Sequence, residues 1–166
     1  MMQPPSDAVR YIDRTRRLYA SQPPYRWVEH DPETQPPPWA PIERELASTR
    51  VALIASGGIH RDDQEPFHFR NDTSHREVPV DTPSSRLRVS HFGYDASDAA
   101  RDPACVFPLR ALRDLADEGA IGAIAGPALS FMGGIYSARQ VREELAPRLR
   151  DIVLRQKADL AYLVPA

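Results

Sequence analysis

Polar side chains that could do chemistry follow two apolar stretches of this sequence. The first stretch, residues 50–56, contains an uninterrupted apolar run at 51–55 and is followed by two glycines, and the second is residues 87–92. Imidazole and carboxylate groups are common proton donors and acceptors, while amide and phenol groups orient substrates. The side chains that come after the two stretches are His60, Gln64, Glu65, His91, Tyr94 and Asp95.

Gly57 and Gly58 stand between the first strand and these polar residues. Two residues without a Cβ let backbone amides approach a ligand closely, so an anion such as a carboxylate could bind there. A plain turn needs the same residues, and that alternative stays open. The pair is part of neither a GxGxxG nor a Walker motif, so the sequence does not indicate nucleotide binding.

Four of the five histidines lie between residues 60 and 91, at positions 60, 68, 75 and 91. Clustered imidazoles suggest a metal, yet these spacings match no compact pair of ligands on a helix. We therefore expect hydrogen-bonding roles and no metal site. His60 and His91 are the better functional candidates, because each lies just beyond a predicted strand.

Several carboxylates could act as a general base, namely Glu65, Asp72, Glu77 and Asp95. In so polar a segment most carboxylates are solvated or bonded to turn amides. Residues 71–77 could equally form a turn in which Asp72 or Thr73 accepts from backbone donors. The lone cysteine, Cys105, precedes a predicted helix, and its apolar neighbours indicate a buried, inert thiol.

The elements that would position these residues alternate between strands and helices. Strands are predicted at 50–56, 87–92, 121–125 and 158–166, and helices at 107–118 and beyond Ser137, where Pro147 should kink or divide the helix. The unbroken apolar run at 51–55 is typical of a strand covered on both faces. We predict an α/β fold with a mostly parallel sheet flanked by helices. Ligands of such sheets bind beyond the carboxyl ends of the strands.

The first 41 residues differ from the rest in composition. A helix is predicted over residues 7–20 with Ser6 as its cap, and residues 21–41 carry most of the clustered prolines together with Trp27 and Trp39. We interpret residues 1–41 as a helix and an extended arm that packs on the domain or on a neighbouring subunit. Residues 42–166 form the α/β domain, so the chain is a single domain overall.

Composition excludes several classes of protein. The 166 residues carry a net charge of −2, with no basic face for nucleic acid, and no run approaches the length of a membrane span. A single cysteine excludes an internal disulfide. The N-terminus lacks the apolar core of a signal peptide, so we expect a cytoplasmic protein with neither nucleic acid nor membrane as partner.

Several motifs in order along the chain resemble the selenoprotein B family, the substrate-specific subunits of glycine, sarcosine, betaine and D-proline reductases. They are "VALIASGGIHRDDQEPF", "NDTSHREVP", "SHFGYD", "VFPLRALRDLADEGAIG" and "SFMGG", with "VRYIDRTRRLY" and "PYRW" before them. The resemblance implies reductive cleavage of a C–N bond in an amino acid or N-methylated amine. It also implies a selenocysteine or cysteine nucleophile and a partner subunit that bears a pyruvoyl group.

The sequence departs from this pattern where the chemistry is expected. In the family the nucleophile lies just beyond a strand resembling residues 158–166, and here no cysteine or selenocysteine follows Pro165. The family's His-Asp-His-Tyr-Asp character becomes His91-Phe92-Gly93-Tyr94-Asp95, with one His and one acid fewer. Three accounts stay open: a reading frame cut at a UGA codon, a nucleophile on a second polypeptide, or loss of the redox chemistry.

The favoured hypothesis is a subunit or fragment of such a reductase whose nucleophile lies outside this chain. The alternative is a non-catalytic subunit that binds a small molecule or supports assembly. We expect an amino-acid-like substrate, no cofactor in this chain, and another subunit or a second copy as partner. The candidate catalytic residues are His60, His91, Glu65 and Asp95, and the candidate substrate-binding residues are Ser56, Gly57, Gly58, Gln64, Tyr94, Ser130 and Met132.

Overall fold

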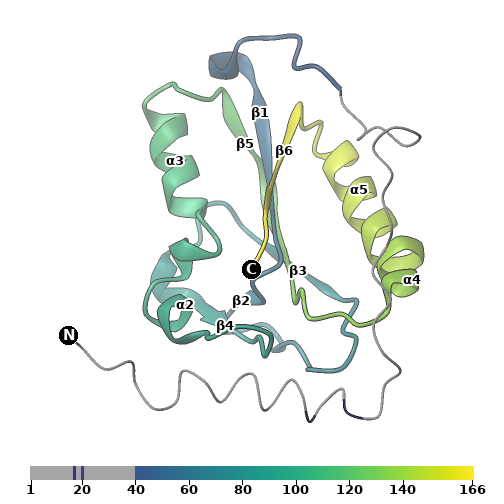
Figure 1. The fold of residues 1–166 in the computed structure, drawn as a ribbon. Helices are drawn as coiled ribbons and strands as arrows, with labels where there is room; N and C mark the ends of the chain where they lie inside the picture. Colours follow the sequence, from purple (N-terminus) through teal and green to yellow (C-terminus); the bar gives the residue numbers. More distant parts are fainter. Residues whose placement is uncertain (1–16, 18–19, 21–39) are drawn as a thin grey trace, which may run out of the picture.

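The computed structural model describes Arg17, Ala20 and residues 40–166 (Figure 1). The helix predicted over 7–20 and the arm predicted up to residue 41 therefore lie almost entirely outside the described residues. In the described part, no helix combines the length and the apolar character needed to cross a membrane.

Six strands and four α-helices are described. The strands are β1 (Arg50–Ala55), β2 (Ile59–Arg61), β3 (His75–Val78), β4 (Leu87–Val89), β5 (Ala123–Phe131) and β6 (Leu160–Val164). The helices are α2 (Ser97–Arg101), α3 (Leu109–Asp117), α4 (Ala138–Gln140) and α5 (Ala146–Arg155), with a π-helical segment at Val141–Leu145. Single 3-10 turns occur at Leu46–Ser48, Ser84–Arg86 and Pro103–Cys105.

The main sheet has the strand order β3-β5-β1-β6. β1 pairs in parallel with both β5 and β6, and β3 pairs antiparallel with β5 at the other edge. The predicted α/β class with a mostly parallel sheet is confirmed. Because β1 has a strand on either side and helices over both faces, it needs apolar residues throughout, as its sequence has.

Helices cover both faces of this sheet (Figure 1). Val51 and Leu53 of β1 pack in one core cluster with Leu112 of α3, whereas Ile54 packs in the other with Leu149 of α5. Alternate side chains of a strand point to opposite faces, so the two helices lie on opposite sides of β1. β1 is therefore fixed from both faces, and the glycine turn directly after it starts from a rigid strand end.

The strand predicted at 87–92 is shorter than predicted and does not belong to the main sheet. β4 covers Leu87–Val89 alone and pairs antiparallel with β2 in a separate two-stranded sheet. Gly58, at φ +70°, redirects the chain out of the main sheet before β2 begins. Residues 60–85, for which the sequence predicted no strand or helix, contain two further strands, β2 at their start and β3.

The helix predictions hold with small shifts in their ends. α3 begins two residues later than predicted and ends at Asp117. Gly119 terminates the helix, because its φ is +74° and its amide donates to the Ala116 carbonyl. Ser137 caps the last helix by accepting from the Gln140 amide. Pro147 divides that helix, because the π-helical turn ends directly before the α-helix that contains it.

Candidate functional site

The carboxyl ends of β1, β5 and β6 meet at one end of the sheet. The Ser56 carbonyl accepts from the Gly133 amide at 2.8 Å, and the Ser56 hydroxyl accepts from the Ala166 amide at 2.9 Å. The Gly58 amide donates to the Phe131 carbonyl at 2.9 Å. The segments after three parallel strands are thus joined directly to one another, at the edge where such sheets bind ligands.

The two glycines bring a second layer close to this edge. A Cβ on Gly58 would lie 2.3 Å from the Ser90 carbonyl oxygen, and one on Gly57 would lie 2.9 Å from the Val106 side chain. The Gly58 amide is already bonded to Phe131, so it is not free for an anion. Gly58 therefore serves backbone packing and a turn, while the binding of an anion by the Gly57 amide stays a prediction.

Tyr94 connects the segment after β4 to Gly57. Its hydroxyl donates to the Gly57 carbonyl at 2.9 Å, and its ring centroid lies 4.6 Å from that of His91. Burial, together with the charge of the Cys105 thiolate, raises the pKa of Tyr94 to about 12. The phenol therefore stays protonated and keeps its donor on the backbone. The structure therefore brings Gly57, Tyr94 and His91 together.

His91 has the most unusual environment in this group. Its side chain is 7% exposed, and burial lowers its pKa from 6.5 to about 4. The Gly93 amide donates to Nδ1 at 2.9 Å, so the neutral ring carries its proton on Nε2. Nε2 is buried and, among the described residues, has no hydrogen-bond partner. A buried donor without an acceptor is costly, which makes Nε2 the polar atom of this group that is still able to bind a further acceptor.

His60 differs from His91 although both were predicted as candidates. Its Nδ1 lies 2.8 Å from the Arg61 carbonyl and its Nε2 lies 3.0 Å from the Ser90 hydroxyl. A carbonyl can only accept, so Nδ1 donates to Arg61, and Nε2 is paired with the Ser90 hydroxyl. Both nitrogens are occupied, and the ring joins β2 to the end of β4.

Ser130 and Met132 lie inside the protein, each with 0% of its surface exposed. The Ser130 hydroxyl accepts from the Ile59 amide at 2.9 Å. Met132 packs with Phe67 and Phe92 in a small apolar cluster. These two residues support the floor of the site and do not open into it.

Three predicted site residues are engaged elsewhere. Gln64 bridges the Arg61 amide and the Glu77 carbonyl, and so holds the loop after β2 against β3. Asp95 is exposed and accepts from the hydroxyl and amide of Ser97, which lower the pKa of Asp95. Glu65 is exposed as well. Within residues 40–166, no hydrogen bond or ion pair joins the Glu65 or Asp95 side chain to either candidate histidine.

Cys105 was predicted to be buried, and that prediction is wrong, because its side chain is exposed. Pro103 and Phe107 take the interior positions around this single turn and leave the thiol on the outside. Burial of part of the group, then Asp102 and Asp98, raise the pKa of the thiol. The predicted low reactivity therefore has a different cause, since an elevated pKa keeps the thiol protonated.

Some residues that shape the site were not singled out as site residues from the sequence. Asn71 accepts from the amides of Tyr136 and Ser137, which ties the loop after β2 to the start of α4. Ser90 holds His60 through its hydroxyl. Asp72 accepts from the amides of His68 and Ser74, in agreement with the predicted turn. In the described chain, no three His, Cys, Asp or Glu side chains converge as metal ligands.

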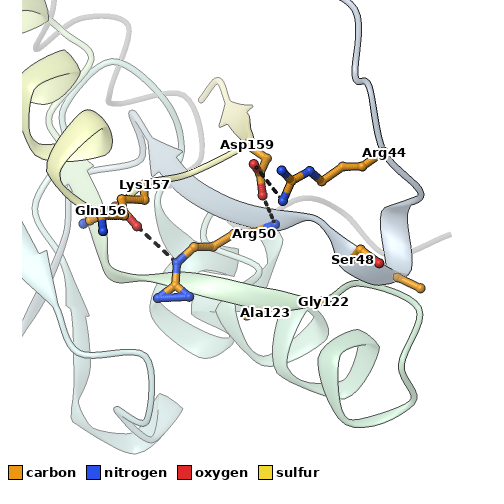
Figure 2. Close-up of a pocket in the computed structure, with 9 residues that line it drawn as sticks. Arg44, Ser48, Arg50, Gly122, Ala123, Gln156, Lys157 and Asp159 are labelled. Carbon is orange, nitrogen blue, oxygen red and sulfur yellow. Dashed lines mark hydrogen bonds and ion pairs between the residues drawn. The ribbon is translucent and has the colours of Figure 1, made fainter.

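A separate cavity of about 680 Å³ lies at the opposite end of β1 (Figure 2). The Arg50 side chain donates to the Gln156 carbonyl, while Asp159 accepts from the Arg50 amide and pairs with Arg44 at 3.4 Å. Gln156, which lines this cavity, has a buried Oε1 without a partner among the described residues, as His91 Nε2 has at the other end of β1. We locate the candidate site at the carboxyl edge, because ligands of parallel sheets bind beyond the carboxyl ends of the strands.

Comparison with known proteins agrees with the motifs. Residues 30–155 match the model of the glycine/sarcosine/betaine reductase selenoprotein B family. D-proline reductase subunit gamma of Acetoanaerobium sticklandii is 36% identical over 132 residues, which are 80% of this chain and 54% of that protein. The chain therefore spans about half the length of this relative. No solved structure matches this chain.

Two further relatives are named as components of reductase complexes. The sarcosine reductase complex component B subunit beta of Peptoclostridium acidaminophilum is 32% identical, over 56% of this chain and 22% of that protein. The glycine reductase complex component B subunit gamma of Symbiobacterium thermophilum is 28% identical, over 71% of this chain and 30% of that protein. The chain belongs to the glycine/sarcosine/betaine reductase selenoprotein B family.

Proposed function

We propose that this chain is a subunit, or a fragment of one, in a cytoplasmic reductase that cleaves a C–N bond in an amino acid or betaine. The observation that carries the proposal is the unpartnered Nε2 of His91 in the described chain, buried at the carboxyl edge of a sheet in a selenoprotein B family member. The relatives are named as reductase subunits, which supports a second kind of subunit as partner.

The proposed reaction breaks a C–N bond and consumes two electrons, which a dithiol supplies. The carbon takes up hydrogen, the amine leaves with the bonding pair and is protonated, and a dithiol is oxidised to a disulfide. The resemblance implies that a selenocysteine or cysteine nucleophile, with a pyruvoyl group on a partner subunit, supplies the covalent chemistry. In our proposal the nucleophile comes from outside residues 1–166, since Cys105 is the sole cysteine and its pKa is raised.

His91 acts in this proposal as a hydrogen-bond donor. Because its pKa is about 4, the ring is neutral at pH 7 and holds its proton on Nε2. A neutral Nε2–H can bind a substrate carboxylate without exchanging a proton with it. Of the two roles considered for His91, proton donor or carboxylate donor, the second agrees with a pKa this low.

Tyr94 and the two glycines position this donor. The Tyr94 hydroxyl donates to the Gly57 carbonyl, which holds the Tyr94 ring in place. The same ring packs against His91 and fixes the imidazole. The Ala166 amide bonds the Ser56 hydroxyl, which brings the end of β6 beside the glycine turn. A nucleophile held near that strand end would therefore lie close to the turn next to His91.

A non-catalytic binding subunit remains the second candidate, and one observation favours it. The candidate general bases do not act on the histidines: Asp95 accepts from Ser97, the first residue of α2, and Glu65 is exposed and forms no hydrogen bond or ion pair with either histidine in the described chain. Such a subunit would bind a small carboxylate through His91 and leave all chemistry to its partners.

The experiment compares the chain with and without its companion subunits. We would assay dithiol-dependent amine or ammonia release from D-proline, sarcosine, glycine and betaine, using the unmodified chain, His91→Phe and Ser85→Ala. Ser85 is the control, because it is exposed. We expect turnover on one substrate, at least tenfold loss of kcat/KM for His91→Phe, and no change for Ser85→Ala.

Each other outcome has a defined meaning. Absence of turnover on every substrate in the complete assembly contradicts the reductase proposal. If a substrate still raises the melting temperature of the unmodified chain but not of His91→Phe, the binding-subunit alternative holds. Equal activity of His91→Phe and the unmodified chain removes His91 from the site.

A further inference from the structure

β6 lies at an edge of the main sheet, and its outer side pairs with no strand in the described part of the chain. Its inner side pairs with β1, from Leu160 opposite Val51 to Val164 opposite Ala55. The strand has the sequence LAYLV, with neither a charge nor a proline to discourage further pairing. An uncharged apolar edge of this kind readily accepts another strand.

An apolar groove runs beside this edge, between β6 and α5. Its volume is about 420 Å³, and Leu163, Leu154 and Val153 are among the side chains that line it. Leu163 is 65% exposed and Leu154 is 67% exposed. Exposed leucines from a strand and a helix thus form one apolar surface that continues from the open strand edge.

The backbone of β6 fixes how a new strand would pair. Val164 turns its carbonyl toward β1, where it accepts from the Ser56 amide at 3.0 Å. Alternate residues of a strand direct their backbone groups to opposite sides, so Ala161 and Leu163 direct theirs to the open edge. In an antiparallel pair, two such residues directly opposite each other exchange both hydrogen bonds.

We propose that β6 pairs antiparallel with β6 of a second copy of this chain, centred on Tyr162. In this register Ala161 lies opposite Leu163 of the second copy, and both have outward backbone groups. Both side chains are on the groove side of the strand. A small residue opposite a large one leaves room for Leu163, so the strand complements itself.

The symmetry of this pairing also suits the helices and the charges. A two-fold axis perpendicular to the sheet keeps both α5 helices on the same face, and their Leu154 side chains cover the junction from either side. Asp159, directly before the strand, faces Pro165 of the second copy instead of its own equivalent. No like charges are therefore opposed. The pairing joins two four-stranded sheets into one and is independent of the proposed reaction.

The test is the mass of the chain in solution, by sedimentation equilibrium up to about 100 μM. We expect twice the monomer mass of 18.6 kDa for the unmodified chain. Leu163→Glu should weaken the dimer at least tenfold, because it places a charge on the apolar junction. Ala161→Pro should do the same by removing one outward N–H, which leaves the pairing with β1 intact. Leu115→Glu is the control, since Leu115 is exposed on α3, across the sheet.

Hydrogen exchange gives a second readout that does not require activity. The Ala161 and Leu163 amides should be protected in the dimer and exchange faster in Leu163→Glu at equal circular dichroism. A monomer at about 100 μM, or a dimer that survives both β6 substitutions, overturns the proposal. Protection of these amides that arises only when companion subunits are added also overturns it, because the edge would then hold another polypeptide.

Discussion

The backbone amide of Gly93 donates a hydrogen bond of 2.9 Å to Nδ1 of His91. This contact determines which nitrogen of the buried imidazole carries the proton. The proton is on Nε2, which has no acceptor within residues 40–166. A Cβ on Gly93 would lie 2.9 Å from Cε1 of the same ring, so the amide reaches Nδ1 where a larger residue would collide with the imidazole. Gly93 thus fixes the tautomer of His91, with the donor on Nε2.

The first prediction concerns the pH dependence of stability. His91 has a folded-state pKa of about 4, against 6.5 for the unperturbed group. The unfolded chain therefore takes up the proton more readily, and stability present above pH 6.5 is lost as the pH falls toward 4. We expect His91 to account for roughly 2 kcal/mol of that loss, after allowing for solvent screening. Urea unfolding at pH 7.0, 5.5 and 4.5 measures it.

The comparison with substituted chains isolates this effect. His91→Phe should have a flatter profile over this pH range, while Ser85→Ala, at an exposed position without an ionisable group, should behave as the unmodified chain does. Nitrogen-15 spectra should show His91 as the Nε2–H tautomer at pH 7. A His91 that titrates near 6.5 in the folded chain, or one protonated on Nδ1, would contradict the assignment.

The second prediction uses two glycines with similar backbone angles and different surroundings. Gly58 and Gly119 have φ of +70° and +74°, but a Cβ on Gly58 would lie 2.3 Å from a carbonyl oxygen, whereas Gly119 has nothing within 4 Å. Gly119→Ala should cost roughly 1 kcal/mol for the left-handed backbone alone. Gly58→Ala should cost about 3 kcal/mol more, because backbone must move. Urea unfolding measures both, and equal losses would refute the close approach of Ser90.

The sequence predicted the central strand and its role well. The unbroken apolar run at 51–55 indicated burial on both faces, and β1 has a helix over each face and a strand at each edge. Gly119 and Ser137 were likewise recognisable as helix limits, because both act locally, one through its backbone angle and the other through its hydroxyl.

The strands of the polar segment could not be predicted in the same way. β3 carries His75, Arg76 and Glu77, and its pairing with β5 depends on a partner far away along the chain, as in His75 opposite Phe131. β2 and β4 have three residues each and are stabilised by each other. Their position relative to Gly58 is decided by tertiary packing, for which a single sequence carries little local signal.

The sequence indicated where the candidate residues lie in the fold, but it did not indicate their hydrogen-bond partners. His91, Tyr94 and Gly57 were expected near one another because they come after strands, and they are in contact directly or through one residue. The sequence could not predict that both ring nitrogens of His60 have partners whereas Nε2 of His91 has none among the described residues, since both histidines come after apolar stretches. What distinguishes them is the Ser90 hydroxyl and the Arg61 carbonyl, which occupy one ring and not the other.

The third prediction concerns the buried turn at Asp72. Burial by itself would raise the pKa of Asp72, but bonds from the hydroxyl and amide of Ser74 and from the His68 amide outweigh it, so that the pKa is lowered. Asp72→Asn keeps the shape and removes the charge, and should cost roughly 1.5 to 3 kcal/mol at pH 7. Asp81→Asn, at an exposed position, should be neutral. Urea unfolding of both variants checks this, and equal stabilities would contradict it.

The fourth prediction concerns the exposed thiol of Cys105. Partial burial, then the carboxylates of Asp102 and Asp98, raise its pKa from the usual 9.0. Alkylation by iodoacetamide should therefore be slower at pH 7 than for a free peptide cysteine, with a midpoint above pH 9 in the rate profile. Asp98→Asn should lower that midpoint and speed alkylation at pH 7, because it removes a negative charge near the thiolate. Ser85→Ala, at a distant exposed position, should leave the rate unchanged. A midpoint below 9 in the unmodified chain would reverse the conclusion, since the thiol would then be activated and Cys105 would become a candidate nucleophile.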